Sequence, residues 1–136
     1  MPLPDDHLFT CGAGCGGIAV DAYGRAQPCL TLRAPELTMG VLDAPLAAAL
    51  ERFTELREMR AAHSDYLGRC ARCFLRGLCE QCPAKSWSEH GTLDTPVDYL
   101  CEVAHAQARH LGWLRDGQLG WEGAEAGITA RRLPKD

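Results

Sequence analysis

The alternation of apolar and polar residues between positions 18 and 29 predicts a β-hairpin near the start of the chain. Ile18 and Val20 alternate with small or charged residues, as the residues of a half-buried strand do. A turn is expected at Gly24, after which the chain returns toward Cys29. The hairpin would therefore bring Cys29 back beside the cysteines that precede it.

Helical spacing of apolar residues begins after Asp43, which can cap a helix that has a proline in its first turn. The expected apolar face consists of Leu46, Leu50, Phe53, Leu56 and, less regularly, Met59. We expect this helix to fray over residues 63–68. The residues before it, 31–41, are expected to form an irregular connection.

Two further helices are predicted in the second half of the chain. The first is short, spans residues 84–90 and is closed by Gly91. The second begins at a capping-box-like Thr95 and runs to about Leu111. One face of it is formed by Cys101, Ala104, Ala108 and Leu111. That spacing predicts that the Cys101 side chain points inward.

Together these elements predict an α+β fold with an N-terminal β-hairpin, about three helices and a cysteine-rich loop. A chain of 136 residues suits one domain. We place this domain at residues 9–112. A lead-in at 1–8 would precede it, and a weakly ordered, glycine-rich tail at 113–136 would follow.

Composition indicates a small apolar core. Hydrophobic residues make up 46% of the chain, but Phe, Tyr and Trp number only three each. A core of this kind is expected to need support from bound metal. The formal net charge of −4 argues against a nucleic-acid partner, which would require a basic surface.

No segment of the sequence predicts export or membrane insertion. The N-terminus carries two acidic residues and no apolar run, and no stretch approaches the roughly 18 apolar residues of a membrane span. We therefore expect no membrane partner and a cytoplasmic location, where thiols stay reduced. Eight cysteines in that setting favour bound metal, with four disulfides as the alternative.

Four of the eight cysteines lie in one run with the spacing C-x2-C-x5-C-x2-C. They are Cys70, Cys73, Cys79 and Cys82. Thiolates are soft ligands that select zinc, Cu(I) or iron–sulfur clusters. A zinc ribbon separates its two C-x2-C pairs by roughly 12–20 residues, so the spacing in this run is short for a ribbon.

Proline directly follows the last cysteine of the run, at Pro83. In bacterial ferredoxins a fourth cysteine followed by proline ligates a different cluster from the three cysteines before it. The run therefore calls for cysteine ligands elsewhere in the chain. The sequence supplies Cys11, Cys15, Cys29 and Cys101.

The order of these cysteines resembles that of the SPASM domain, an extension of many radical SAM enzymes that carries two auxiliary [4Fe–4S] clusters. The pattern in this chain is Cys11-x12-Gly24-x4-Cys29, then Cys70-x2-Cys73-x5-Cys79-x2-Cys82, then Cys101. The segments VDAYGRAQPC and CARCFLRGLCEQCPA are also similar to family segments. The resemblance covers about residues 9–112.

The resemblance implies a separate ligand set for each cluster. The first cluster would be held by Cys11, Cys15, Cys29 and Cys82. The second would be held by Cys70, Cys73, Cys79 and Cys101. Two spacings depart from the family. The gap from Cys79 to Cys82 is two residues where three is common, and the gap from Cys11 to Cys15 is shorter than in members with an additional first-cluster ligand.

The resemblance further implies electron transfer or a structural role in, or alongside, a radical SAM enzyme that modifies a peptide or protein. The C-x3-C-x2-C motif of the catalytic core is absent, because Ile18 stands where its third cysteine would be. The βα barrel of such a core needs about 200 residues. The chain alone is therefore expected to be non-catalytic. Its expected partners are a radical SAM core or partner enzyme and a precursor peptide.

Two alternatives belong to other functional classes. A structural zinc module would use the same cysteines to hold two zinc ions, and a docking module would keep the clusters but bind a partner or precursor peptide. Arg69, Arg72 and Arg76 lie among the second-cluster ligands and would raise the reduction potential of that cluster. No histidine is predicted to be a ligand, and His105 is expected on a helix surface.

Overall fold

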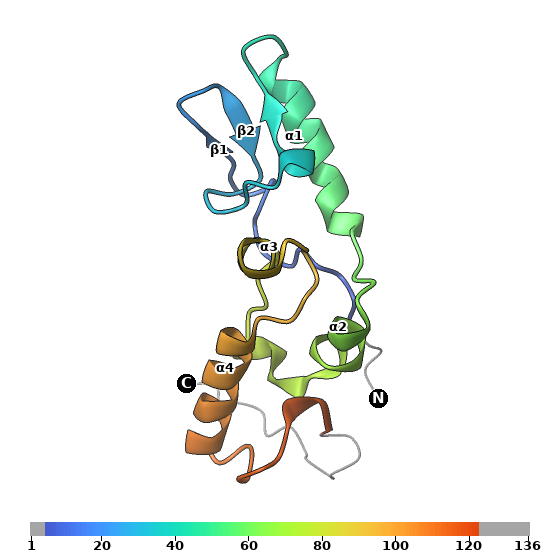
Figure 1. Cartoon of the computed structure of the whole chain (residues 1–136), viewed down its shortest axis with the longest axis vertical. Helices are drawn as coiled ribbons and strands as arrows, with labels where there is room; N and C mark the ends of the chain where they lie inside the picture. The colour runs from blue at the N-terminus through green and yellow to red at the C-terminus, as the bar shows by residue number, and fades with distance from the viewer. Residues whose placement is uncertain (1–4, 123–136) are drawn as a thin grey trace. The chain divides into compact units, whose positions relative to one another are not determined.

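A computed structural model describes residues 5–122 of the chain, and these form two compact units. Within the described residues, unit 1 comprises residues 5–6, Ala62–Gln81 and 96–122. Unit 2 comprises His7–Ala61 and Cys82–Thr95. The sequence predicted a single domain over residues 9–112. Each unit is assembled from segments that are distant in the sequence (Figure 1).

Unit 2 contains a small antiparallel sheet in the order β1-β2-β3. Its strands are β1 (Ala19–Val20), β2 (Arg25–Gln27) and β3 (Met39–Gly40). Ala19 lies opposite Gln27, which confirms the predicted hairpin. The third strand was not predicted, since residues 31–41 were expected to be irregular. It pairs with β2 with Gly40 opposite Arg25.

The hairpin turn is fixed by Asp21 and Gly24. One carboxylate oxygen of Asp21 accepts hydrogen bonds from the backbone N–H groups of Tyr23 and Arg25, at 2.9 and 3.0 Å. Gly24 adopts a φ of 72°, a conformation that favours glycine. A Cβ added there would also collide with the side chain of Leu42. The predicted turn therefore depends on glycine at this position.

Helix α1 (Leu46–Thr54) and the 3₁₀ turn η2 (Glu55–Glu58) supply the apolar surface of unit 2. Their buried residues are Ala49, Phe53 and Leu56. Leu46 and Leu50 were predicted on the inner face but are exposed. The buried face is narrower than expected: Phe53 and Leu56 pack against the loop at Gly14, where an added Cβ would lie 2.8 Å from the Phe53 side chain.

Helix α3 (Pro83–His90) also belongs to unit 2 and matches the predicted short helix. Proline opens it, and Gly91 ends it with a φ of 74°, the left-handed cap expected there. The hydroxyl of Ser86 is buried in this helix. It donates to the carbonyl oxygen of Thr92 at 2.7 Å and accepts from the backbone N–H of Thr95 at 3.0 Å. These bonds fold the segment after α3 back against the helix.

Unit 1 consists of short helical pieces around one longer helix. They are α2 (Ser64–Gly68), η3 (Cys70–Arg72), η4 (Phe74–Gly77), α4 (Asp98–His110) and η5 (Gly120–Glu122). The sequence predicted fraying over 63–68, where the structure has α2. Helix α4 was predicted, although it begins at Asp98 without a side-chain cap. The whole described chain is α+β, as the sequence predicts.

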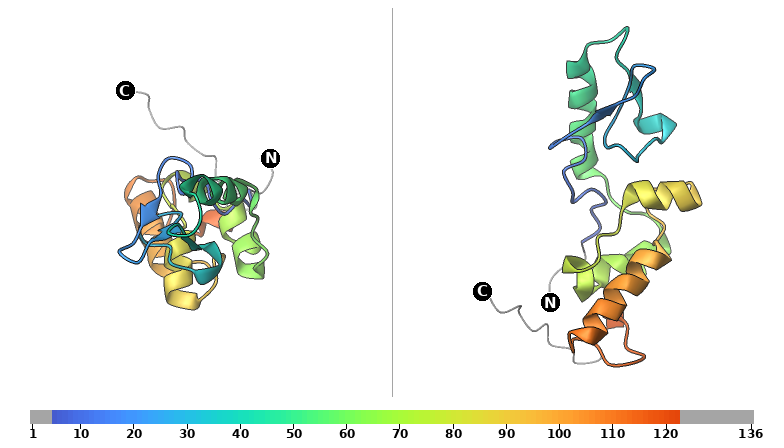
Figure 2. Two further views of the ribbon diagram at one scale, coloured as in Figure 1. Left: turned by 90° about the horizontal axis from the view of Figure 1, so that it is seen from above. Right: turned by 90° about the vertical axis from the view of Figure 1, so that its left-hand side faces the viewer.

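The core of unit 1 includes a residue from the predicted tail. Leu75, Ala108 and Leu114 are buried together, and partly buried Trp113 packs against them. Figure 2 shows the chain turning back after α4, and the backbone N–H of Gly120 bonds to a side chain of that helix. The prediction of a weakly ordered tail is therefore wrong for residues 113–122. Residues 123–136 of that prediction lie outside the described residues.

Among the residues that the structure describes, no helix has both the length and the apolar character needed to cross a membrane.

Candidate metal centres

Unit 1 brings four of the predicted ligands to one place. They are Cys70, Cys73, Cys79 and Cys101. All six pairs of these thiols are electrostatically coupled, with a negative charge on one member raising the pKa of the other. Three of the thiols lie in and around η3 and η4, and the fourth lies in the first turn of α4. The turns of the cysteine run and the start of a helix thus converge on a single site.

Burial and neighbouring charge both oppose ionisation of these thiols. Burial is the larger cause and, with the neighbouring thiolates, raises the pKa of Cys70 to about 12 and that of Cys73 to about 11. The pKa of Cys79 is raised as well, again mainly by burial. Four such groups become stable thiolates together only when a cation compensates their charge. The donor set therefore fits a positively charged metal centre.

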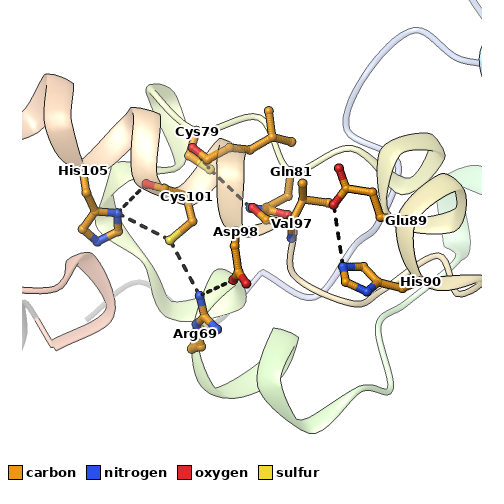
Figure 3. Close-up of polar contacts among 10 residues, drawn as sticks. Arg69, Cys79, Gln81, Glu89, His90, Val97, Asp98, Cys101 and His105 are labelled. Atoms are coloured by element: carbon orange, nitrogen blue, oxygen red, sulfur yellow. Dashed lines mark hydrogen bonds and ion pairs between the residues drawn. The ribbon is translucent and has the colours of Figure 1, made fainter.

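Hydrogen bonds from side chains reach two of these sulfur atoms (Figure 3). Arg69 Nη2 lies 3.7 Å from Cys101 Sγ, and Gln81 Nε2 lies 3.6 Å from Cys79 Sγ. Gln81 also accepts from the backbone N–H of Val97 at 2.9 Å and donates to its carbonyl oxygen at 3.3 Å. These bonds join the segment that carries Cys79 to the start of the helix that carries Cys101.

His105 is buried beside this site, contrary to the prediction of a helix-surface position. Its Nε2 accepts from the backbone N–H of Gly120 at 2.9 Å. In the neutral ring the proton is therefore on Nδ1, which donates to the carbonyl oxygen of Cys101 at 2.8 Å and lies 3.5 Å from Cys101 Sγ. His105 thus supports a thiol ligand and joins α4 to η5.

Unit 2 holds the other four predicted ligands. They are Cys11, Cys15, Cys29 and Cys82. The backbone N–H of Gly14 donates to the carbonyl oxygen of Pro28 at 2.9 Å, which holds the first two cysteines beside the third along the backbone. Arg57 Nε donates to Cys15 Sγ at 3.2 Å. The first two thiols are exposed and the other two are half-buried.

Cys82 lies at the N-terminus of α3 and lines a cavity of about 500 Å³ together with Thr31 and Arg33. The Thr31 hydroxyl lies 3.5 Å from Cys29 Sγ, so the cavity reaches the surroundings of Cys29. The backbone N–H groups at a helix N-terminus favour negative charge.

The spacing of the sulfur atoms distinguishes two kinds of metal centre. In the described part of the chain, which contains all eight cysteines, no three Sγ atoms lie within 4.8 Å of one another. A single tetrahedral zinc ion with Zn–S bonds near 2.3 Å would hold its sulfur atoms about 3.8 Å apart. A four-iron cubane separates its thiolate ligands further, because each binds a different iron.

Sequence reasoning missed several residues around the two sites. They are Arg57, His105, Gly120 and Trp121. The position of His105, four residues after Cys101 on a helix, could have placed it on the same face as that ligand. No comparable signal marks Gly120 or Trp121, since they lie in a segment without apolar periodicity.

Comparisons of the chain with protein-family models, curated proteins and solved structures found no match. Functional interpretation therefore rests on the residues and contacts described above.

We predict that the metal-free chain loses stability as the pH rises from about 9 toward about 12. The folded-state pKa values of Cys70 and Cys73 lie above the ordinary thiol value of 9.0, so the unfolded chain releases their protons first. Their contribution to stability is complete below pH 9 and declines as the pH approaches the folded values. Urea unfolding under reducing, anaerobic conditions at a series of pH values measures the decline.

A double variant with Cys70→Ser and Cys73→Ser serves as the control, because its hydroxyls do not ionise in this range. The slope of stability against pH should be shallower in the variant than in the natural chain. Equal slopes would contradict the proposed burial of these thiols.

Gly120→Ala should destabilise unit 1 even without metal. An added Cβ would lie 2.5 Å from Cys73 Sγ and 3.0 Å from two atoms of Leu75. Overpacking of this kind costs about 1–3 kcal/mol of unfolding free energy. Gly77→Ala is the matched control, because a Cβ there meets open space. Denaturant unfolding of both variants tests the contact, and similar stabilities would argue against it.

Proposed function

We propose that this chain is an iron–sulfur protein that carries two [4Fe–4S] clusters, one in each unit. The observation that carries this proposal is the boundary between the units, which falls between Gln81 and Cys82. Cys79 and Cys82 are three positions apart, yet they belong to different units. Each unit thereby contains four cysteines, the number that one cubane requires. These two groups are the ligand sets that the family resemblance implies.

Donor chemistry and spacing support clusters rather than mononuclear ions. All eight donors are thiols, which suit both zinc and iron–sulfur centres. In the part of the chain described, no three sulfur atoms lie within 4.8 Å of one another, as one bound zinc ion would bring them. Coupling among all four thiols of unit 1 indicates that they nevertheless surround one site.

The protein residues around each set prepare it for an electron-carrying group. When bound, a [4Fe–4S] cluster with four thiolate ligands accepts and releases one electron and leaves no iron open to substrate. Arg57 in unit 2 and Arg69 in unit 1 place positive charge beside thiol ligands. Positive charge stabilises thiolates, and it favours the reduced form of a cluster.

This chemistry suits a one-electron carrier in, or alongside, a larger enzyme. A low-potential donor, such as a reduced flavin or another iron–sulfur centre, would supply the electron, and the partner enzyme would receive it. From the resemblance, we assign the partner as a radical SAM enzyme that modifies a peptide or protein. A cytoplasmic location is part of the proposal, since reduced thiols are needed to hold the clusters.

Anaerobically prepared or reconstituted protein should contain about eight irons and eight acid-labile sulfides per chain, as expected for two four-iron cubanes. Iron and sulfide analysis, together with the broad visible absorption of cubanes, measures this. A content near four irons would remove one cluster from the proposal. Two zinc ions without sulfide would replace it with the structural zinc module.

Cys82→Ala and Cys79→Ala form a matched pair that tests the division of ligands. Cys82→Ala should lose the cluster of unit 2, and Cys79→Ala should lose the cluster of unit 1. A ligand at Cys82 closes a loop of about 70 residues back to Cys11, whose length-dependent entropy cost is about 4 kcal/mol. Metal binding contributes the free energy that offsets this cost. Loss of Cys82 should therefore also loosen residues 9–30.

Iron content, electron paramagnetic resonance and hydrogen exchange distinguish the outcomes. In Cys82→Ala, faster exchange in the 18–29 hairpin with the unit 1 signal retained supports the division. If the hairpin instead stayed protected and the unit 1 signal were lost, Cys82 would be a ligand of the unit 1 cluster, and the proposed division would be wrong.

A further inference from the structure

Arg69 has a buried donor without a partner. Its Nε is the one buried side-chain nitrogen or oxygen in the described part of the chain that makes no hydrogen bond. The rest of the guanidinium is held on several sides. Nη2 lies 3.7 Å from both Cys101 Sγ and a carboxylate oxygen of Asp98, and the group stacks over the Trp121 ring at 4.6 Å. Figure 3 shows Arg69 beside Cys101 and Asp98.

A buried N–H of a charged group is costly to leave unpaired, so an acceptor is expected close to it. Arg69 directly precedes Cys70, and its charge acts on the thiols of both Cys70 and Cys73. The guanidinium that carries Nε therefore lies beside the four-thiol set of unit 1, with Nη2 at 3.7 Å from Cys101 Sγ. The sulfur atoms of a cluster held there would be suitable acceptors.

The other two arginines of this region have different surroundings. Arg72 is exposed. Arg76 forms an ion pair with Asp5 at 3.5 Å, and its positive charge also lowers the pKa of Cys79. The sequence predicted positive charge on the cysteine run from all three arginines together. Arg69 differs from the other two in that its guanidinium contacts a ligand sulfur, Cys101 Sγ, at 3.7 Å and stacks on the Trp121 ring.

We propose that Arg69 donates a hydrogen bond through Nε to a sulfur atom of the unit 1 cluster and raises its reduction potential, with Trp121 holding the guanidinium in place. This inference rests on the proposed function. Adding an electron makes the cluster more negative, so a fixed cationic donor stabilises the reduced form more than the oxidised form. Arg69 is therefore a tuning residue, and Trp121 is a positioning residue.

The surroundings of Trp121 explain how it can hold Arg69. Its ring meets His105 edge-on, with centroids 5.4 Å apart and planes at 67°. The neighbouring Gly120 is bonded to the same histidine through its backbone N–H. His105 in turn contacts Cys101. The turn at residues 120–121 is thereby fixed against the ligand set, and the cation–π contact fixes Arg69 against the turn.

A redox titration of the cluster-loaded full chain, followed by electron paramagnetic resonance, tests the proposal. Arg69→Met should move one of the two midpoint potentials to a lower value and leave the other unchanged. Arg72→Met is the matched control and should move neither. Trp121→Ala should shift the same midpoint downward by a smaller amount, and Trp121→Phe, which retains an aromatic face, should restore it.

Electron–nuclear double resonance on the reduced cluster adds a reading that a structural role alone would not change. The natural chain and Arg72→Met should show coupling to an exchangeable proton that Arg69→Met lacks. Unchanged potential and coupling in Arg69→Met would overturn the proposal, as would an equal shift in Arg72→Met.

Metal analysis of the natural chain separates failure of this inference from failure of the proposed function. A natural chain without four-iron clusters would defeat the proposed function itself. A natural chain with both clusters, but with no effect of Arg69, would defeat only the tuning role. If Arg69→Met does not retain its cluster, the midpoint potentials of Arg69→Lys and Trp121→Ala are measured instead. Unchanged midpoint potentials in both variants would overturn the proposal.

Discussion

The gathering of four buried thiols around one point is the constraint on which the structure of unit 1 depends. Burial and mutual repulsion raise the pKa values of these thiols, which keeps them protonated when no cation is present. A cation bound among them would compensate the charge of the thiolates and so favour their ionised form. The surrounding polar groups belong to the same arrangement, because Gln81 and Arg69 direct donors toward sulfur. The short helical segments of this unit carry these thiols or lie next to them.

The cysteines of unit 2 are arranged differently. They come from a glycine-rich loop, a hairpin and a helix N-terminus, and a backbone hydrogen bond from Gly14 to Pro28 joins the first two of these segments. Two of these thiols are exposed.

The parts of the fold that the sequence predicted have strong local signals. The hairpin follows from alternation and a glycine turn, and the short helix over 84–90 follows from its proline and glycine ends. Residues 113–122 have no periodicity, and their packing depends on long-range contacts such as that of Leu114 with Leu75. The burial of His105 likewise depends on Gly120, which lies 15 positions further along the chain. Local patterns carry no information about such partners.

Thiol chemistry and spacing in the sequence predicted a metal site, and the family resemblance implied how the eight cysteines divide into two sets; that division stays a prediction. Division into two units was not predictable from local signals, since it depends on contacts between segments far apart in the chain. The unit boundary after Gln81 separates Cys79 from Cys82, which lie three positions apart.

Gln81 has a further consequence for how the site in unit 1 is assembled. Its amide bonds to both the N–H and the carbonyl oxygen of Val97, as a neighbouring strand would. The loop between these residues is therefore closed by protein contacts alone, and metal binding need not supply the entropy of that closure. The two bonds tie the segment that carries Cys79 to the start of the helix that carries Cys101. The cluster proposed for unit 1 would meet two of its ligands on segments that are already joined, so its binding would not have to form this closure.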